Sequence, residues 1–253
     1  MIPSPIVNPE SVRGSTIQKH GVPESFRGSS HGQACVFYGA AEFSRDADLL
    51  IVADPENLDR LCAALRELEA TRIFVPELNE DVLRRGHAVH FRCATPEADR
   101  IRVDIMAVLR GVDSFDQLWQ RRTTIGDDLG NEYNLLSLAD LVKAKKTQRL
   151  KDWPMITRLL EANYAENKEA PMSGQVRFWL QEMRTPKYLI EIAGKFPSAA
   201  VEIAKERPLL QRAIAGEVTE LETALINEQT AEQERDKEYW RPLRAEIERL
   251  RRI

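Results

Sequence analysis

Short apolar or alternating runs of residues predict β-strands in the first half of the chain. Residues 46–53 form a β-rich run, and residues 87–93 and 101–109 have the alternating or compact apolar pattern of further strands. Apolar residues at a spacing of three and four predict an amphipathic helix over 56–71, and a second helix is predicted over 114–122. Strands and helices in this order predict a mixed β-sheet with helices packed on it.

Beyond residue 134 the pattern is helical almost throughout. Ser137 is placed to cap a helix that begins at Leu138, and Pro or Gly residues separate the helices predicted after it. Those helices cover residues 159–164, 176–183, 187–195, 198–205 and 208–228. The prediction is therefore an α/β (α+β) protein in three parts. These are an irregular Pro-, Gly- and Ser-rich lead-in over residues 1–30 with a short helix near 16–20, a mixed-sheet domain over 31–164 and an all-helical region over 165–253.

Charge and composition narrow the class of protein. The 253 residues carry 36 Lys and Arg against 40 Asp and Glu, a net charge of −4, which argues against non-specific coating of nucleic acid but allows a local basic patch. Residues 231–252 interleave six acidic with seven basic side chains, which favours a solvated helix face over a nucleic-acid-binding arm.

Cysteine usage and hydropathy indicate neither a secreted nor a membrane protein. The three cysteines, Cys35, Cys62 and Cys93, are odd in number and too far apart in sequence to suggest a disulfide framework or paired zinc ligands. No apolar run approaches the roughly 18 residues that a membrane span needs. We expect a protein of the reducing cytoplasm, without a membrane partner.

Three aspartates are the candidate metal ligands. Asp46 and Asp48 are two residues apart at the start of a strand that is expected to be buried, so their side chains share one face. In residues 101–106, alternation places apolar side chains on one face and Asp104 on the other. If the two strands are neighbours, the three carboxylates converge, and such a trio suits two Mg²⁺ ions about 4 Å apart for phosphoryl or nucleotidyl transfer.

A purely structural interpretation of the same aspartates is open. Asp46 and Asp48 could lie in a turn at the exposed start of their strand, with Asp104 paired to an arginine. What favours the metal site is electrostatics, because like charges side by side at a buried strand repel and need a cation between them.

Two sequence blocks resemble a known superfamily. The run HGQACVFYGAAEFSRDADLLIV at residues 31–52, followed by a helix and by RVDIM at 102–106, resembles the nucleotidyltransferases typified by DNA polymerase β. The resemblance is closest to the small bacterial branch of abortive-infection and toxin–antitoxin nucleotidyltransferases. A second block, LSLADLVKAK at 136–145 with RLKD at 149–152, is similar to a downstream helix of that branch. The resemblance covers about residues 31 to 160 and implies a nucleotidyltransferase core.

The resemblance implies roles for particular residues. Asp46, Asp48 and Asp104 match the three catalytic, metal-binding carboxylates, with two Mg²⁺ ions (or Mn²⁺) as cofactors. The nucleotide-binding residues that it implies are Gly32, Gln33, Ser44, Lys145 and Arg149. Backbone N–H groups of Gly32 and Gln33 would cradle the phosphates of an NTP, and Lys145 would neutralise charge that develops on pyrophosphate.

The basic second block allows several interpretations. Lys145 and Arg149 are four residues apart and share a helix face, so both could turn towards phosphates. Arg149 could instead orient Asp152, which would act as a base or as an orienting group. One alternative is a solvated basic face on which Asp152 pairs with Arg149. Another is that this face contacts an RNA backbone.

Two positions depart from the family pattern. His31 stands where the first turn glycine is usual, and Glu42 stands where relatives often carry a basic residue. Gly39 matches the second family glycine and is equally compatible with a simple turn between helix and strand.

The resulting hypothesis is a Mg²⁺-dependent nucleotidyltransferase that moves an NMP from an NTP to an acceptor hydroxyl. RNA, protein and small molecules are all acceptors in this branch. The alternative is a non-catalytic protein of the same fold that serves as a partner protein in a toxin–antitoxin-type system. His31, Glu42 and the charged C-terminal helix motivate this alternative, in which the C-terminal helices would contact the partner.

Overall fold

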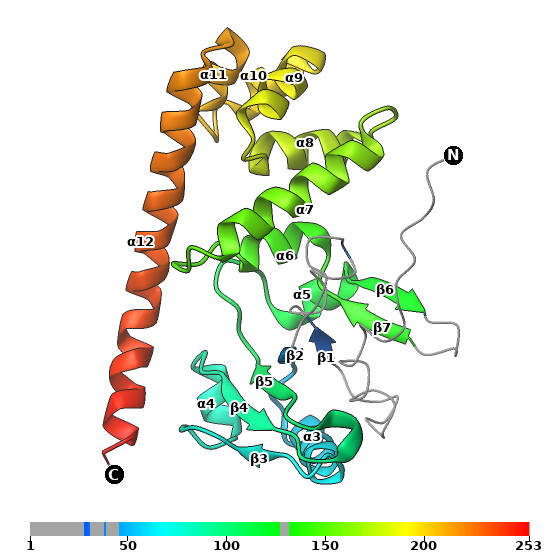
Figure 1. The fold of residues 1–253 in the computed structure, drawn as a ribbon, viewed down its shortest axis with the longest axis vertical. Coiled ribbons are helices and arrows are strands. Elements are labelled where there is room, and N and C mark those ends of the chain that lie inside the picture. Colours follow the sequence, from blue (N-terminus) through cyan, green and yellow to red (C-terminus); the bar gives the residue numbers. More distant parts are fainter. Residues whose placement is uncertain (1–27, 31–37, 39–45, 127–131, 253) are drawn as a thin grey trace. The chain divides into compact units, whose positions relative to one another are not determined.

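The computed structural model describes residues 28–30, 38, 46–126 and 132–252 (Figure 1). The chain divides into two compact units. The first unit comprises Met1–Phe37, Ala41–Leu141 and Arg241–Ile253, and the second comprises Tyr38–Ala40 and Val142–Trp240. The domain limits predicted from the sequence, after residues 30 and 164, stay a prediction.

A mixed β-sheet is the framework of the first unit. Its described strands are β1 (Gly28–Ser30), β2 (Asp46–Ile51), β3 (Thr71–Arg72), β4 (Val89–Arg92), β5 (Arg102–Met106), β6 (Thr123–Gly126) and β7 (Glu132–Leu135). These strands form one sheet in the order β3-β4-β5-β2-β1-β7-β6. β2 runs parallel to β5 and β1 parallel to β7, whereas the other neighbouring pairs are antiparallel. The predicted mixed sheet is therefore confirmed.

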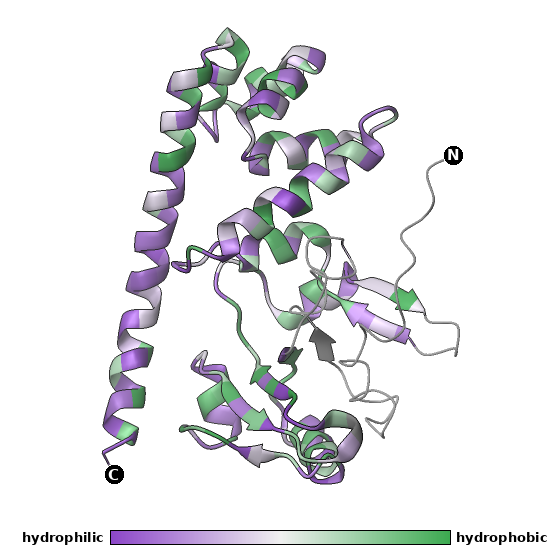
Figure 2. Cartoon of the chain, viewed as in Figure 1, coloured by the Kyte–Doolittle hydropathy of each residue, from purple (hydrophilic) through white to green (hydrophobic). Residues whose placement is uncertain are grey.

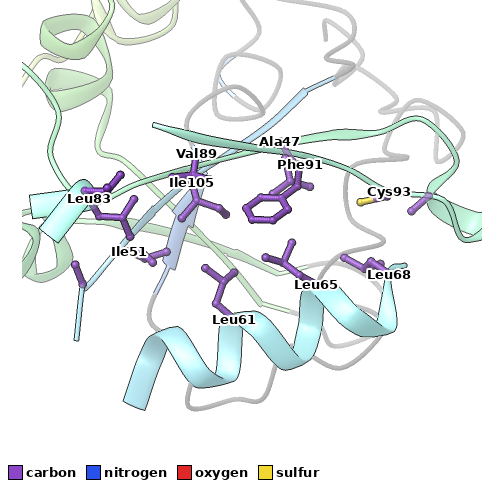
Figure 3. Packing of buried hydrophobic residues seen from close by; sticks show 14 residues of the cluster. Ala47, Ile51, Leu61, Leu65, Leu68, Leu83, Val89, Phe91, Cys93 and Ile105 are labelled. Carbon is purple, nitrogen blue, oxygen red and sulfur yellow. The ribbon is translucent and has the colours of Figure 1, made fainter. Parts of the chain in front are cut away.

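Helices α3 (Pro55–Glu67) and α4 (Glu80–Arg84) contribute to the main apolar core of this unit. Asp54 caps α3, because its Oδ1 accepts a hydrogen bond from the backbone N–H of Asn57 at 2.8 Å. The leucines of α3 pack against alternate, buried residues of β2, β4 and β5 (Figure 3). Burial of each such side chain stabilises the fold by about 1.5–3 kcal/mol. The remaining residues of these strands therefore occupy the opposite face of the sheet.

Three short helical segments complete the first unit and its junction with the second. They are η3 (Pro96–Ala98), α5 (Phe115–Gln120) and α6 (Leu138–Ala144). Ser114 is the N-cap residue of α5, and Ser137 Oγ accepts from the backbone N–H of Asp140 at the start of α6, at 3.2 Å. The helix predicted to begin at Leu138 is thus present.

Helices make up the second unit. They are α7 (Asp152–Asn167), α8 (Ser173–Glu182), α9 (Pro186–Lys195), α10 (Pro197–Ile203), α11 (Leu210–Ala215) and α12 (Val218–Leu250), of which α12 continues into the first unit. The rings of Tyr164 and Trp179 meet edge to face with centroids 5.0 Å apart in its core. Figure 2 shows that α12 is polar along most of its length. The all-helical C-terminal region expected from the sequence is confirmed.

Several local predictions were wrong. Residues 28–30, expected to be irregular, form β1, and the single helix expected over 208–228 is interrupted at Gly216, whose positive φ of 72° ends α11. The pattern also missed β3, β6, β7 and α4. These elements have two to five residues, too few for apolar periodicity to identify them.

None of the described helices combines the length and the apolar character that crossing a bilayer requires. The short helix expected near residues 16–20 lies outside the described residues.

Candidate functional site on the polar face of β2, β4 and β5

The predicted carboxylates lie on two neighbouring strands. β2 and β5 pair in parallel, with Asp46 opposite Arg102 and Asp48 opposite Asp104. Side chains at paired positions lie on the same face of a sheet, and residues two apart on a strand share that face. Asp46, Asp48 and Asp104 therefore occupy one face, opposite the face that packs on α3. The sequence predicted that the three carboxylates converge if these two strands are neighbours, and β2 and β5 are neighbours.

Strand β4 adds two residues to the same face. β4 pairs antiparallel with β5 on the side away from β2, with His90 opposite Asp104 and Arg92 opposite Arg102. Asp104 thus lies between Asp48 and His90 across three neighbouring strands.

The carboxylate of Asp104 is held by two side chains. Arg102 donates from Nε to Oδ1 at 2.7 Å and from Nη2 to Oδ2 at 2.9 Å. His90 Nδ1 lies 2.8 Å from Oδ1. Because a carboxylate only accepts, Nδ1 carries the proton in this contact, so its 3.0 Å approach to Arg102 Nη2 is not a hydrogen bond. The arginine partner anticipated by the structural interpretation is present.

Electrostatics favour the charged forms of this pair. Burial acts to raise the pKa of Asp104, but the hydrogen bonds from His90 and Arg102 outweigh it, so the pKa lies below its ordinary value. Burial likewise acts to lower the pKa of Arg102, but the hydrogen bond to Asp104 and the negative charges of Asp104, Asp46 and Asp48 raise it. The guanidinium of Arg102 therefore interacts electrostatically with all three aspartates.

The donor set suits a hard divalent cation, although its present geometry is not that of a metal site. Among the described residues, no group of three or more His, Cys, Asp or Glu side chains is arranged to hold a metal ion. Asp46 is exposed and Asp48 is half-buried, whereas both oxygens of Asp104 are turned to Arg102 and His90. Carboxylate oxygens on one sheet face are the ligands that Mg²⁺ prefers, provided that Asp104 is released by Arg102.

Residues 145–151, the basic part of the second block, lie in the second unit between α6 and α7. Arg149 Nε donates to Asp152 Oδ2 at 2.9 Å, and Thr147 Oγ1 donates to the same oxygen at 2.5 Å. Lys146 pairs with Glu182 at 2.5 Å, whereas Lys145 is half-buried. The pairing of Arg149 with Asp152 is the one that the structural alternative anticipated. Asp152 is buried in this contact, and a role of Lys145 or Arg149 in binding phosphate stays a prediction.

Several predicted nucleotide-binding positions lie outside the described residues. These are Gly32, Gln33 and Ser44, together with His31, Gly39 and Glu42. Their predicted roles stay predictions.

Sequence reasoning missed His90 and Arg102. A signal for Arg102 was present, because it precedes Asp104 by two residues in the same strand and so shares its face. His90 lies at an alternating position of the strand predicted over residues 87–93, but its contact with Asp104 depends on the pairing of β4 with β5, which a single sequence does not show.

Comparison with known proteins finds a structural similarity but no match to a family model or to a curated protein. Among solved structures, the chain is similar to a crystal structure of a protein from H. pylori described as a candidate nucleotidyltransferase. That similarity has 9% sequence identity and a TM-score of 0.39, and it covers 91% of this chain and 98% of the H. pylori chain.

Proposed function

We propose that the protein is a Mg²⁺-dependent nucleotidyltransferase, which transfers an NMP from an NTP to an acceptor hydroxyl. The observation that carries this proposal is the register of β2 and β5, which puts Asp48 directly opposite Asp104 with Asp46 on the same face. The resemblance of residues 31–52 and 102–106 to nucleotidyltransferases points to the same three carboxylates.

Each group has a distinct task in the proposed reaction. Asp46 and Asp48 would hold the divalent ions, and Asp104 would complete the site on the acceptor side after losing its contact with Arg102. Bound Mg²⁺ supplies charge neutralisation on the phosphates and lowers the pKa of the attacking hydroxyl. Gly32, Gln33 and Ser44 are the proposed nucleotide contacts, and the backbone N–H groups of Gly32 and Gln33 would bind the triphosphate. The acceptor is RNA, a protein or a small molecule.

Ligand-dependent stabilisation tests this proposal. A ligand that binds the folded state at a hundred times its Kd stabilises it by about 2.7 kcal/mol, an increase in Tm of about 5–10 °C for a protein of this size. We expect such a shift only when Mg²⁺ and an NTP are present together. The variant Asp48→Asn should lose the shift and keep its Tm without ligand. Asp59→Asn, the same change on the exposed side of α3, should behave as the wild type.

One observation favours a second candidate function. Both oxygens of Asp104 are bound by Arg102 and His90, which is also the arrangement of a carboxylate that only stabilises the sheet. A non-catalytic partner protein with this fold, of the toxin–antitoxin type, would keep that pair permanently. Absence of any shift with Mg²⁺ and NTPs, together with a protein that co-purifies with the chain, would support this candidate and contradict the enzyme.

A further inference from the structure

The two oxygens of Asp104 differ in how firmly they are held. Among the described residues, Oδ1 accepts from both Arg102 Nε at 2.7 Å and His90 Nδ1 at 2.8 Å, whereas Oδ2 accepts only from Arg102 Nη2 at 2.9 Å. If the side chain of Arg102 moves away, Oδ2 loses both its hydrogen-bond donor and the neighbouring positive charge. Oδ1 meanwhile stays on His90, so the carboxylate keeps its orientation.

Arg102 has the position and the freedom for such a movement. Its side chain is 33% exposed, and it projects from β5 opposite Asp46 on the same face as Asp48. Its guanidinium puts a positive charge next to three like charges that repel one another, and the charges of Asp104, Asp46 and Asp48 raise its pKa. A divalent ion bound to these carboxylates would supply twice that charge in the same place.

His90 is placed to keep the carboxylate of Asp104 in its orientation. It lies on β4, a strand outside the two that carry the aspartates, and its ring meets Phe74 edge to face with centroids 6.1 Å apart. The side chain of His90 is 23% exposed and that of Asp104 is 13% exposed, so their contact lies largely within the protein. Hydrogen bonds to a ligating carboxylate orient it towards the metal, and their loss typically weakens metal binding about 10–100-fold.

We propose that Arg102 is an internal counter-cation that gives up Asp104 when a divalent ion binds, and that His90 is the positioning residue that holds Asp104 in orientation during this exchange. This inference rests on the proposed function, because it assumes that a divalent ion binds at these carboxylates. The inference adds His90 of β4 to the site, a residue that is not part of the three-aspartate pattern.

Variants of His90 test the positioning role. The probe is Mn²⁺ without nucleotide, and its affinity is measured by calorimetry and by the electron paramagnetic resonance of the free ion. The amide nitrogen of Asn stands where His carries Nδ1, whereas that of Gln stands nearer to Nε2. We expect His90→Ala and His90→Gln to weaken Mn²⁺ binding about 10–100-fold and His90→Asn to keep it within about threefold of the wild type.

Rescue by Asn separates positioning from general packing. Circular dichroism and Tm select the variants that keep the fold, and Asn and Gln are the two that retain polar bulk if Ala does not fold. Wild-type affinity in His90→Gln, or equal losses in His90→Asn and His90→Gln, would overturn the positioning role.

Removal of the Arg102 charge tests the exchange. Arg102→Met keeps the length of the side chain and removes the competitor, so we expect Mn²⁺ to bind at least about threefold more tightly than to the wild type, while the metal-free protein becomes less stable. Arg92→Met is the matched control, because it removes the same charge from the paired position on β4, and the described contacts of Asp104 do not include Arg92. Equal gains in both variants, or weaker binding in Arg102→Met, would contradict the exchange.

The wild type and Asp48→Asn distinguish failure of this inference from failure of the proposed function. If Mn²⁺ binds the wild type and Asp48→Asn loses it, the metal site stands, and unchanged binding in the His90 and Arg102 variants overturns the inference alone. If wild type and Asp48→Asn bind Mn²⁺ equally or not at all, the proposed metal site fails, and this inference fails with it.

Discussion

Asp140 shows how a polar residue of a sequence motif can serve the fold. It is 2% exposed, and it accepts from Arg121 Nε at 2.7 Å and from Ser137 Oγ at 2.6 Å. Arg121 also donates to Asp113, at 2.6 Å, on the exposed side. The conspicuous Asp of the LSLADL block therefore ties the start of α6 to the end of α5.

Replacement of Asp140 should destabilise the protein much more than replacement of Asp113. Asp140→Ala removes a buried carboxylate that accepts hydrogen bonds from both Arg121 and Ser137, and it should lower the free energy of unfolding by about 1–3 kcal/mol. Asp113 is 52% exposed, so the exposed ion pair lost in Asp113→Ala should cost about 0–1 kcal/mol. Urea denaturation measures both values. Equal losses would show that the burial of Asp140 does not matter.

Residue-scale features could be predicted in part from the sequence. Alternation alone indicated that Asp46 and Asp48 share a face and that Asp104 is opposite its apolar neighbours, and the pairing of β2 with β5 bears out both. The sequence could not show which partner holds Asp104, because Arg102 and His90 reach it through side-chain geometry and the register of β4.

At the scale of elements, α12 is more than a solvated helix. Ion pairs within the helix, such as Lys237 with Glu234 at 2.6 Å, fit the predicted charged face. Asp236 between them is 2% exposed, and its carboxylate accepts from the backbone N–H of Gln148 at 2.8 Å and from Trp240 Nε1 at 3.1 Å. One residue of the charged stretch thus fixes the segment that carries Lys145 and Arg149.

Loss of Asp236 should loosen that segment. In Asp236→Ala the amide of Gln148 loses its acceptor, and its hydrogen-exchange protection should fall about tenfold or more. Lys237→Ala, which changes an exposed neighbour, should leave that protection unchanged. Exchange followed by mass spectrometry or NMR gives the result, and unchanged protection at Gln148 in Asp236→Ala would contradict the role of Asp236.

A pair of glycines tests why the helix predicted over residues 208–228 is interrupted. Gly216 has a φ of 72°, and nothing lies within 4 Å of the place where a Cβ would stand, so Gly216→Ala should cost about 1–2 kcal/mol through the backbone alone. Gly194 lies within α9 with equally open space, so Gly194→Ala should stabilise the protein by up to about 1 kcal/mol. Thermal unfolding measures both. Opposite signs are predicted, and a stabilising Gly216→Ala would contradict the explanation.

Longer elements were the predictable ones. The 13 residues of α3 and the 6 residues of β2 have clear periodicity, and both lie where the sequence placed them. The two residues of β3 and the four of β6 have no period of their own and form through pairing with neighbouring strands.

At the scale of the whole molecule, the second compact unit contains a cluster of largely buried charged groups. In the second unit Glu228 accepts from Arg207 at 2.9 and 2.8 Å and from Arg184 at 2.5 Å, and both arginines are less than 10% exposed. Arg207 also donates to the carbonyl oxygens of Leu180 and Met183. One carboxylate therefore links α12 to the segments that follow α8 and α10.

The stability of this unit should fall in acid because of Glu228. Burial acts to raise the pKa of Glu228, but the hydrogen bond and charge of Arg207 outweigh it, and the pKa lies below its ordinary value. Because the folded pKa is lower than the unfolded one, the stabilisation is complete above about pH 5 and is lost as the pH falls through the folded pKa.

Glu228→Gln should therefore be less stable than the wild type at neutral pH, and its free energy of unfolding should fall less between about pH 5 and pH 3. The exposed change Glu169→Gln should leave the wild-type pH profile intact. Denaturation by urea across this range checks the slope, and parallel profiles for Glu228→Gln and the wild type would contradict the assignment.

Transfer of label from an α-³²P-labelled NTP to cellular RNA and protein tests the central claim most directly. With Mg²⁺, the wild type should label an acceptor and release pyrophosphate. Asp48→Asn should lose at least about 10²-fold in rate while its circular dichroism and Tm stay those of the wild type. Labelling by Asp48→Asn that equals the wild type would contradict a nucleotidyltransferase built on the aspartates of β2 and β5.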